Sequence, residues 1–165
     1  MSFNIISCIT NIVSYIFKMI TILVPTDFSK NANNALDYAV SLAKKGKANL
    51  ILLHAYNITN ISPDVPLEFC AAQLAATELD AARILNTLCD KIKKEDNFEC
   101  EFINHEGDVG DVILDATKQT KANLIVMGTK GASGIKEVLM GSNTVKVIGR
   151  ATCPVIAVPE KAAFD

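Results

Sequence analysis

Two hydrophobic patterns alternate along this chain. Short apolar runs, rich in isoleucine, leucine and valine, are typical of strands that are buried on both faces of a sheet. These runs lie at 20–24, 48–56, 98–104, 123–127 and 154–158. The run at 98–104 carries more polar residues than the others, so we expect it near an edge of the sheet.

Between these runs, apolar residues recur every three or four positions, which is typical of amphipathic helices. The helical stretches begin after Ser29, run over 67–94, follow the Gly-Asp pair at 107–108 and lie at 144–148. Ser29 and Ser142 are favoured N-cap residues for the first and last of these helices. Helices that alternate with strands indicate right-handed crossovers between parallel strands. The pattern therefore predicts one α/β domain, an open five-stranded parallel sheet with helices on both faces.

Residues 1–18 differ from the rest of the chain. They form an apolar stretch with a few Ser, Asn and Thr residues, and Lys18 is its only charge. The stretch is too short for a membrane span and lacks the basic start of a signal peptide. We interpret residues 1–18 as an N-terminal extension outside a domain of residues 19–165. A start assigned upstream in error would explain it, and a segment that touches a membrane or a partner protein is the alternative.

Composition narrows the function further. The 165 residues suffice for one domain with a substantial core. A net charge of −2 disfavours nucleic-acid binding, which needs clustered Lys and Arg. The five cysteines are scattered without a C-x-x-C pair, which argues against a disulfide framework and indicates a reducing compartment. With two histidines and no close ligand spacing, a zinc site is disfavoured.

The stretch at 127–142 holds the clearest candidate chemistry. Its glycines lie between the apolar run at 123–127 and a helix, and glycine lets a backbone approach a ligand closely. Backbone N–H groups at Gly141, Ser142 and Asn143 would point at open space with the helix dipole behind them, an arrangement suited to phosphate. The P-loop motif G-x-x-x-x-G-K-[ST] does not occur, and the glycines do not follow the dinucleotide spacing G-x-G-x-x-G.

The turn at 24–29, Val-Pro-Thr-Asp-Phe-Ser, follows the first strand. Open α/β sheets bind ligands beyond the carboxyl ends of their strands, where this turn and the glycine stretch both lie. The Asp27 carboxylate would repel phosphate without a cation. It therefore fits a hydrogen-bond acceptor for a base or ribose, or a Mg²⁺ ligand. Taken alone, Asp27 could equally help to cap the following helix.

These two segments resemble the nucleotide-binding signature of the universal stress protein family. The spacing Gly128-x2-Gly131-x9-Gly141-Ser142 is similar to its glycine motif, and ATP-binding members carry a similar Asp-containing turn after the first strand. The resemblance extends over residues 19–159. It implies the strand order 3-2-1-4-5, as in the adenine-nucleotide α-hydrolase-like folds, with both segments facing one crevice.

The resemblance also implies which residues meet the nucleotide. The turn of Pro25, Thr26 and Asp27 would pack beside the adenosine, and the backbone of Ala55 would meet the adenine edge. Met127 and Gly128 would form the wall near the ribose. The phosphate cradle would consist of Gly131, Gly141, Ser142 and Asn143. Asn143 stands where some members carry an apolar residue, but its backbone N–H should serve equally.

The resemblance implies a cytoplasmic, ATP-binding universal stress protein that binds ATP together with Mg²⁺ and regulates an unidentified protein partner, with slow or no hydrolysis. We identify no catalytic residue, and His54 is interpreted as a hydrogen-bonded structural histidine. The resemblance further implies a homodimer in which Val155 to Val158 pair across a two-fold axis, since an apolar edge strand needs covering. The alternatives are a nucleotide-free interaction module of the same fold, and an ATPase or nucleotidyl transferase of the related adenine-binding folds.

Overall fold

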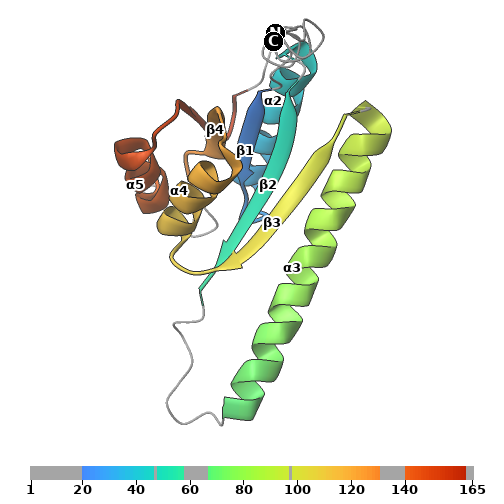
Figure 1. The fold of residues 1–165 in the computed structure, drawn as a ribbon, viewed down its shortest axis with the longest axis vertical. Coiled ribbons are helices and arrows are strands. Elements are labelled where there is room, and N and C mark those ends of the chain that lie inside the picture. Colours follow the sequence, from blue (N-terminus) through green and yellow to red (C-terminus); the bar gives the residue numbers. More distant parts are fainter. Residues whose placement is uncertain (1–19, 47, 58–66, 97, 131–139, 163–165) are drawn as a thin grey trace, which may run out of the picture.

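The computed structural model describes residues 20–46, 48–57, 67–96, 98–130 and 140–162. Strands and helices alternate along the whole of this part of the chain (Figure 1). In chain order the elements are β1 (Thr21–Pro25), α2 (Lys30–Gly46), β2 (Asn49–Tyr56), α3 (Leu67–Asp96), β3 (Cys100–Glu106), α4 (Val109–Thr120), β4 (Leu124–Gly128), α5 (Ser142–Arg150) and β5 (Val155–Val158). The predicted α/β class is confirmed.

The strands form one parallel sheet in the order β3-β2-β1-β4-β5, as predicted. β1 lies at its centre, with Thr21 aligned to Asn49 of β2 and Ile22 aligned to Leu124 of β4. The reversal of strand order therefore occurs between β1 and β4. In folds of this kind that reversal is where the loops at the carboxyl ends of the strands separate and leave a crevice.

Helices cover both faces of the sheet. On one face, Ile22 and Val24 of β1 are buried against α2 and α3, and on the other, Leu23 is buried against α4 and α5. Figure 1 shows α4 and α5 on the side of the sheet opposite α3. Burying one such side chain stabilises the fold by about 1.5–3 kcal/mol, so the apolar runs dominate the energetics of the sheet.

β3 lies at an edge of the sheet, as its polar composition predicted, but its limits differ from the prediction. It begins at Cys100 rather than at residue 98 and continues to Glu106, which pairs with Tyr56 of β2. Several of its side chains, including those of Glu101 and Phe102, are exposed. Because an edge strand is only half buried, its hydrophobic pattern is weak, and the pattern does not mark where the strand ends.

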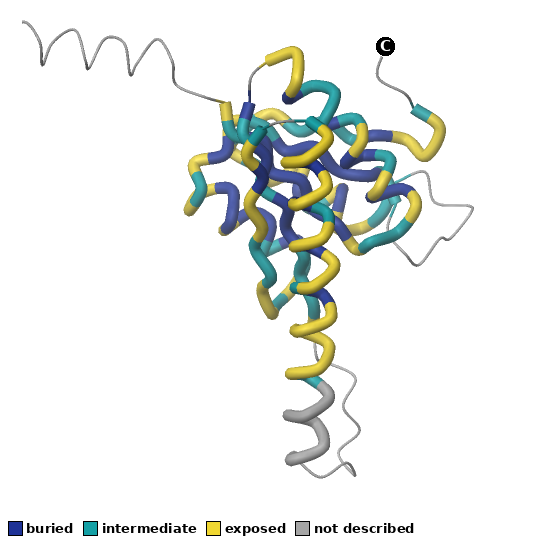
Figure 2. Tube along the Cα trace, turned by 90° about the vertical axis from the view of Figure 1, so that its right-hand side faces the viewer, coloured by how far each residue is buried: buried dark blue, intermediate teal, exposed yellow. Residues whose placement is uncertain are grey.

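α3 is much longer than the sheet that it covers. Its C-terminal part packs on the sheet through Ala81, Leu85 and Ile92, whereas the side chains of residues 75–80 are exposed. Figure 2 shows this exposed part extending away from the rest of the domain. Among the residues described, no helix combines the length and the apolar character that crossing a membrane requires.

Candidate functional site

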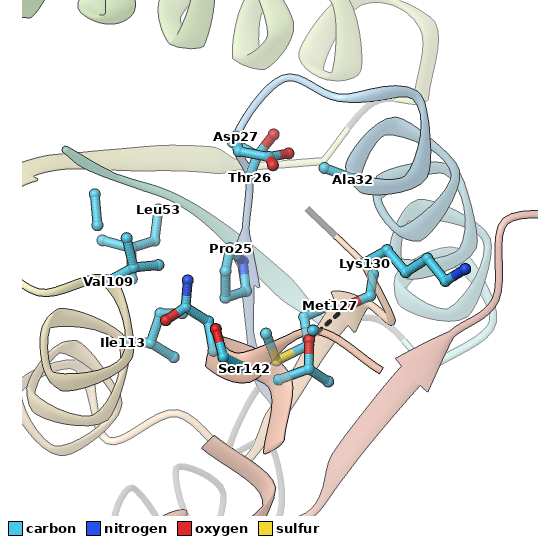
Figure 3. A pocket seen from close by; sticks show the side chains of 15 residues that line it. Pro25, Thr26, Asp27, Ala32, Leu53, Val109, Ile113, Met127, Lys130 and Ser142 are labelled. Carbon is cyan, nitrogen blue, oxygen red and sulfur yellow. Dashed lines mark hydrogen bonds between the residues drawn. The ribbon is translucent and has the colours of Figure 1, made fainter. Parts of the chain in front are cut away.

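A pocket of about 290 Å³ opens at the carboxyl ends of the central strands. The turn after β1, the ends of β2 and β4, and the first turns of α2, α4 and α5 contribute to it (Figure 3). Its lining residues are Pro25, Thr26, Asp27, Ala32, Leu53, Ala55, Val109, Ile113, Met127, Gly128, Lys130, Gly141, Ser142, Asn143 and Thr144. The pocket thus lies at the reversal of strand order, where open α/β sheets bind ligands.

Side-chain to backbone hydrogen bonds shape the turn after β1. Thr26 Oγ1 accepts from the N–H of Phe28 at 3.0 Å, and Asp27 Oδ1 accepts from the N–H of Ser29 at 3.1 Å. These bonds stabilise Phe28 at φ 62°, a left-handed conformation that non-glycine residues rarely adopt. Ser29 Oγ accepts from the N–H of Ala32 at 3.2 Å, so its predicted capping role is confirmed. Asp27 therefore helps to build the turn while lying exposed at the rim of the pocket.

His54 supports this turn from the neighbouring strand. Its Nδ1–H donates to the carbonyl of Thr26 at 2.8 Å, since a carbonyl oxygen can only accept. The imidazole stacks on Phe28 with ring centroids 4.5 Å apart, and the ring of Tyr56 lies 6.3 Å away. The contacts with Thr26 and Phe28 support a structural role for His54, because both hold the turn and His54 is not among the residues that line the pocket.

Two hydrogen bonds fix the start of α5 against the end of β4. Thr144 Oγ1 donates to the carbonyl of Gly128 at 3.0 Å, and the N–H of Gly141 donates to the carbonyl of Thr129 at 2.7 Å. Gly141 is the N-cap residue, with φ −68° and ψ 151°, and Ser142 is the first helical residue. The prediction of Ser142 as the cap was therefore wrong, because the bond to Thr129 sets the helix start one residue earlier.

The first turn of α5 presents backbone donors to the pocket. The N–H of Gly141 is used by Thr129, so the prediction that it points at open space was wrong. Ser142 and Asn143 lie in the first helical turn, where N–H groups have no partner within the helix, and both residues line the pocket. The helix dipole adds partial positive charge at the same point. This side of the pocket therefore favours an anionic group.

Part of the pocket lining is apolar. Val109 and Ile113 of α4, Leu53 of β2 and Pro25 of β1 contribute to this part (Figure 3). Val109 and Ile113 were not among the site residues predicted from the sequence. Their position along the chain could have indicated their place in the pocket, because α4 begins directly after the carboxyl end of β3 and so starts at the same edge of the sheet as the pocket. The pocket lining thus combines an apolar part with a part that favours anions.

Gly128 is required by packing as well as by its place in the pocket. A Cβ atom at this position would lie 2.8 Å from Oδ1 of Asn31 in α2. Asn31 is almost fully buried, and its Nδ2 donates to Oγ1 of Thr129 at 3.4 Å. The close approach of α2 to the end of β4 therefore accounts for this glycine without any ligand.

Ion pairs join α5 to the start of α4 beside the pocket. Lys146 Nζ lies 2.7 Å from Asp108 Oδ1 and 2.9 Å from Asp111 Oδ2, and Arg150 lies 2.9 Å from Asp111 Oδ1. Asp108 also caps α4 by accepting from the N–H of Asp111. The hydrogen bond from Lys146 lowers the pKa of both carboxyl groups, and they in turn raise the pKa of Lys146. The two helices that flank the pocket are therefore tied together at their surface.

The structure brings most of the predicted site residues around this one pocket. They are Pro25, Thr26, Asp27, Ala55, Met127, Gly128, Gly141, Ser142 and Asn143. The tenth, Gly131, lies outside the residues that the structure describes. Lys130 lines the rim, but Figure 3 shows its side chain directed away from Val109 and Ile113. The role of the predicted site residues in binding stays a prediction, while the common location of the nine described ones is now defined.

Comparison with known proteins agrees with this arrangement. Residues 19–159 match the Universal stress protein family. The chain is 33% identical over 143 residues to Universal stress protein YxiE of Bacillus subtilis. The match covers 82% of this chain and 96% of that protein. Among solved structures, it is similar to universal stress protein UspA from Lactobacillus plantarum, with a TM-score of 0.77, 26% identity and coverage of 84% of this chain and 97% of the other.

A second solved structure is that of a universal stress protein in complex with cAMP. Its TM-score to this chain is 0.60 at 26% identity, covering 87% of this chain and 98% of the other. The fold, the family match and the relatives agree along the same stretch of sequence. This chain belongs to the universal stress protein family.

Proposed function

We propose that this protein binds ATP in the pocket between the β1 turn and the start of α5. The observation that carries the proposal is that the lining of one pocket combines two chemically different parts. Val109, Ile113 and Leu53 offer an apolar wall suited to a base, and the first turn of α5 offers N–H groups suited to phosphate. The ligand class that combines a flat, largely apolar ring with an anionic group is a nucleotide.

The relative that was solved with cAMP supports an adenine nucleotide as the ligand class. In our proposal the adenosine packs beside Pro25, Thr26 and Ala55, and the phosphates extend along Gly141, Ser142 and Asn143, with Gly131 completing the cradle. The residues of the pocket also fit Mg²⁺ bound with ATP. Asp27 is the one acidic side chain among the described lining residues, and Mg²⁺ is commonly held by one or two carboxylates together with substrate phosphates. Bound there, the cation would offset the repulsion between Asp27 and the phosphates.

The proposed role is regulatory. Ordering of the β1 turn and of the start of α5 around ATP would change the surface offered to a protein partner, with slow or no hydrolysis, in the cytoplasm. We further propose a homodimer through β5, which among the described strands pairs with β4 alone and leaves Val155 and Ile156 partly exposed. A partner strand would satisfy the backbone groups of this edge.

The first test is the nucleotide content of the purified protein, followed by titration calorimetry with Mg-ATP. The informative variant is Ser142→Asp, with Ser142→Asn as its neutral match. At a separation of roughly 5 Å and an effective dielectric constant of roughly 40, the added charge opposes the nearest phosphate charge by about 1–2 kcal/mol. The dissociation constant should therefore rise about 5- to 30-fold in Ser142→Asp and change little in Ser142→Asn.

The same variant separates loss of binding from loss of folding. Asp in the first turn of a helix is favoured by the helix dipole by about 0.3–1 kcal/mol, so the thermal midpoint of the nucleotide-free protein should not fall. Equal affinities for the two variants would refute the placement of the phosphates. Absence of bound nucleotide together with no thermal shift on adding Mg-ATP would refute nucleotide binding and favour an interaction module. Sustained turnover lost in Asp27→Ala would instead identify an ATPase.

A further inference from the structure

Two cysteines from different elements meet at the end of the sheet opposite the pocket. Cys89 lies in the C-terminal part of α3, and Cys100 is the first residue of β3. Their sulfur atoms are 2.9 Å apart, and the residues are only 4% and 2% exposed. Both belong to the apolar cluster that also contains Leu85 and Ile92, so no water layer separates them from each other.

The geometry of this pair suits a covalent bond between the sulfurs. A disulfide has an S–S distance of about 2.05 Å, so the sulfurs need to approach by less than about 1 Å. The two residues are separated by 11 positions in the sequence, and they meet because α3 folds back along the edge strand.

A third cysteine whose side chain the structure describes occupies a different environment. Cys153 packs against the cluster on the opposite face of the sheet, with Leu23, Ile125 and Val147. The sheet therefore separates it from Cys89 and Cys100. Its partial burial raises the pKa of its thiol, which disfavours the reactive thiolate form. Cys153 is accordingly a matched internal control for any chemistry at the other pair.

We propose that Cys89 and Cys100 form a redox site, in which a small hydroperoxide converts the two thiols into a reversible intramolecular disulfide. The Cys89 thiolate attacks one oxygen of the peroxide, the O–O bond breaks, and the departing hydroxide takes up a proton to become water. The Cys100 sulfur then attacks the Cys89 sulfenic acid, the S–O bond breaks, and the Cys100 proton leaves with the second water. Two thiols are oxidised and one molecule of hydrogen peroxide is reduced to two waters.

The assignment of Cys89 as the attacking sulfur follows from the contacts of the pair. The contact between the two sulfurs lowers the pKa of the Cys89 thiol and raises that of Cys100, whose S–H can also donate to the carbonyl of Glu101 at 3.8 Å. The ammonium of Lys93, one helical turn further along α3, favours the Cys89 thiolate as well. A burial as deep as this excludes bulky oxidants, so we assign a peroxide of the size of H₂O₂.

The bond would tie the C-terminal part of α3 to the edge strand β3. Cys100 lies at the amino end of its strand, whereas the pocket lies at the carboxyl ends. The redox site is therefore independent of the proposed nucleotide site, and either can fail without the other.

The test is a disulfide map of the full-length chain after exposure to hydrogen peroxide, alkylation of free thiols and digestion with trypsin. Lys91, Lys93 and Lys94 lie between the two cysteines, so trypsin separates Cys89, in the peptide 84–91, from Cys100, in the peptide 95–118. We expect these peptides to appear as one linked species, lighter than their sum by two hydrogen atoms, and to separate again after treatment with dithiothreitol. Cys153 should remain alkylated.

Cysteine variants test whether the link is specific to Cys89 and Cys100. Cys89→Ala should abolish the linked species, whereas Cys153→Ala should leave it unchanged. Three results would each overturn the proposal. One is irreversible oxidation of Cys89 without a link to Cys100, and another is a link from Cys89 or Cys100 to a different cysteine. The third is full alkylation of both residues after a peroxide treatment that oxidises free glutathione. The map of the unmodified chain decides the question even if Cys89→Ala fails to fold.

Discussion

The hydrogen bond from Thr144 to the carbonyl of Gly128 holds the first turn of α5 against the sheet, and Thr144→Val removes it. Valine keeps the branched shape of threonine, so the substitution deletes a donor while leaving little empty space. The Thr144 side chain is only 3% exposed, and water therefore cannot easily replace the lost donor. A buried acceptor left without its partner costs about 1–3 kcal/mol, and we expect the free energy of unfolding to fall by that amount.

Thr120→Val is the matched control. Thr120 Oγ1 donates to the carbonyl of Ala116 at 2.7 Å within α4, and this carbonyl also accepts the helical N–H of Thr120. Because that acceptor keeps a partner, the same substitution should cost less than about 0.5 kcal/mol there.

The assay is urea unfolding followed by far-ultraviolet circular dichroism, with the free energy extrapolated to water and an unchanged denaturant slope as the criterion for comparing variants. A loss below about 0.5 kcal/mol for Thr144→Val would refute the reasoning, since the net worth of a typical buried hydrogen bond exceeds it. Equal losses for Thr144→Val and Thr120→Val would refute it as well.

Two further predictions concern the surroundings of the pocket. Gly128→Ala should lower the free energy of unfolding by about 1–3 kcal/mol through the clash with Asn31. Adding Asn31→Ala should recover part of this loss. Strictly additive losses in the double variant would contradict the clash. Lys146→Met removes the cation that lowers the pKa values of Asp108 and Asp111. Because the folded pKa values are lowered, the stability that they contribute is complete at neutral pH and is lost as the pH falls through them. The wild type should have the higher urea midpoint at pH 7, and the difference should shrink from about pH 4 downward; a difference independent of pH would contradict this assignment.

The sequence predicted the elements of the fold well because burial imposes strong patterns on central strands. The runs that became β1, β2 and β4 are nearly continuous in apolar residues, as two covered faces require. The order of the strands is not encoded in such patterns, and it was predicted from the family resemblance. The limits of β3 were missed because its solvent-exposed positions accept polar residues, which weakens the hydrophobic pattern of the strand.

The site was predicted where it depends on local sequence and missed where it depends on packing. The turn at Thr26 and Asp27 is built from contacts between residues two positions apart, which the sequence displays directly. The contact between Lys146 and Asp108 spans 38 positions, and the apolar wall from α4 depends on how that helix lies against the sheet. No local pattern specifies such contacts, because they follow from the relative placement of whole elements.

The two edges of the sheet differ in a way that limits how many chains could assemble through them. The β3 edge carries Glu101 and Glu106 as exposed charges, and a second strand approaching it would bring its own copies of these carboxylates close by. The segment Val155 to Val158 at the other edge carries no charge. A chain with two neutral edges could add copies without end and grow into a fibre, whereas a chain with one neutral edge stops after a single pairing. If chains pair through the edges of the sheet, the charges on β3 and their absence on β5 favour a closed pair over a growing fibre.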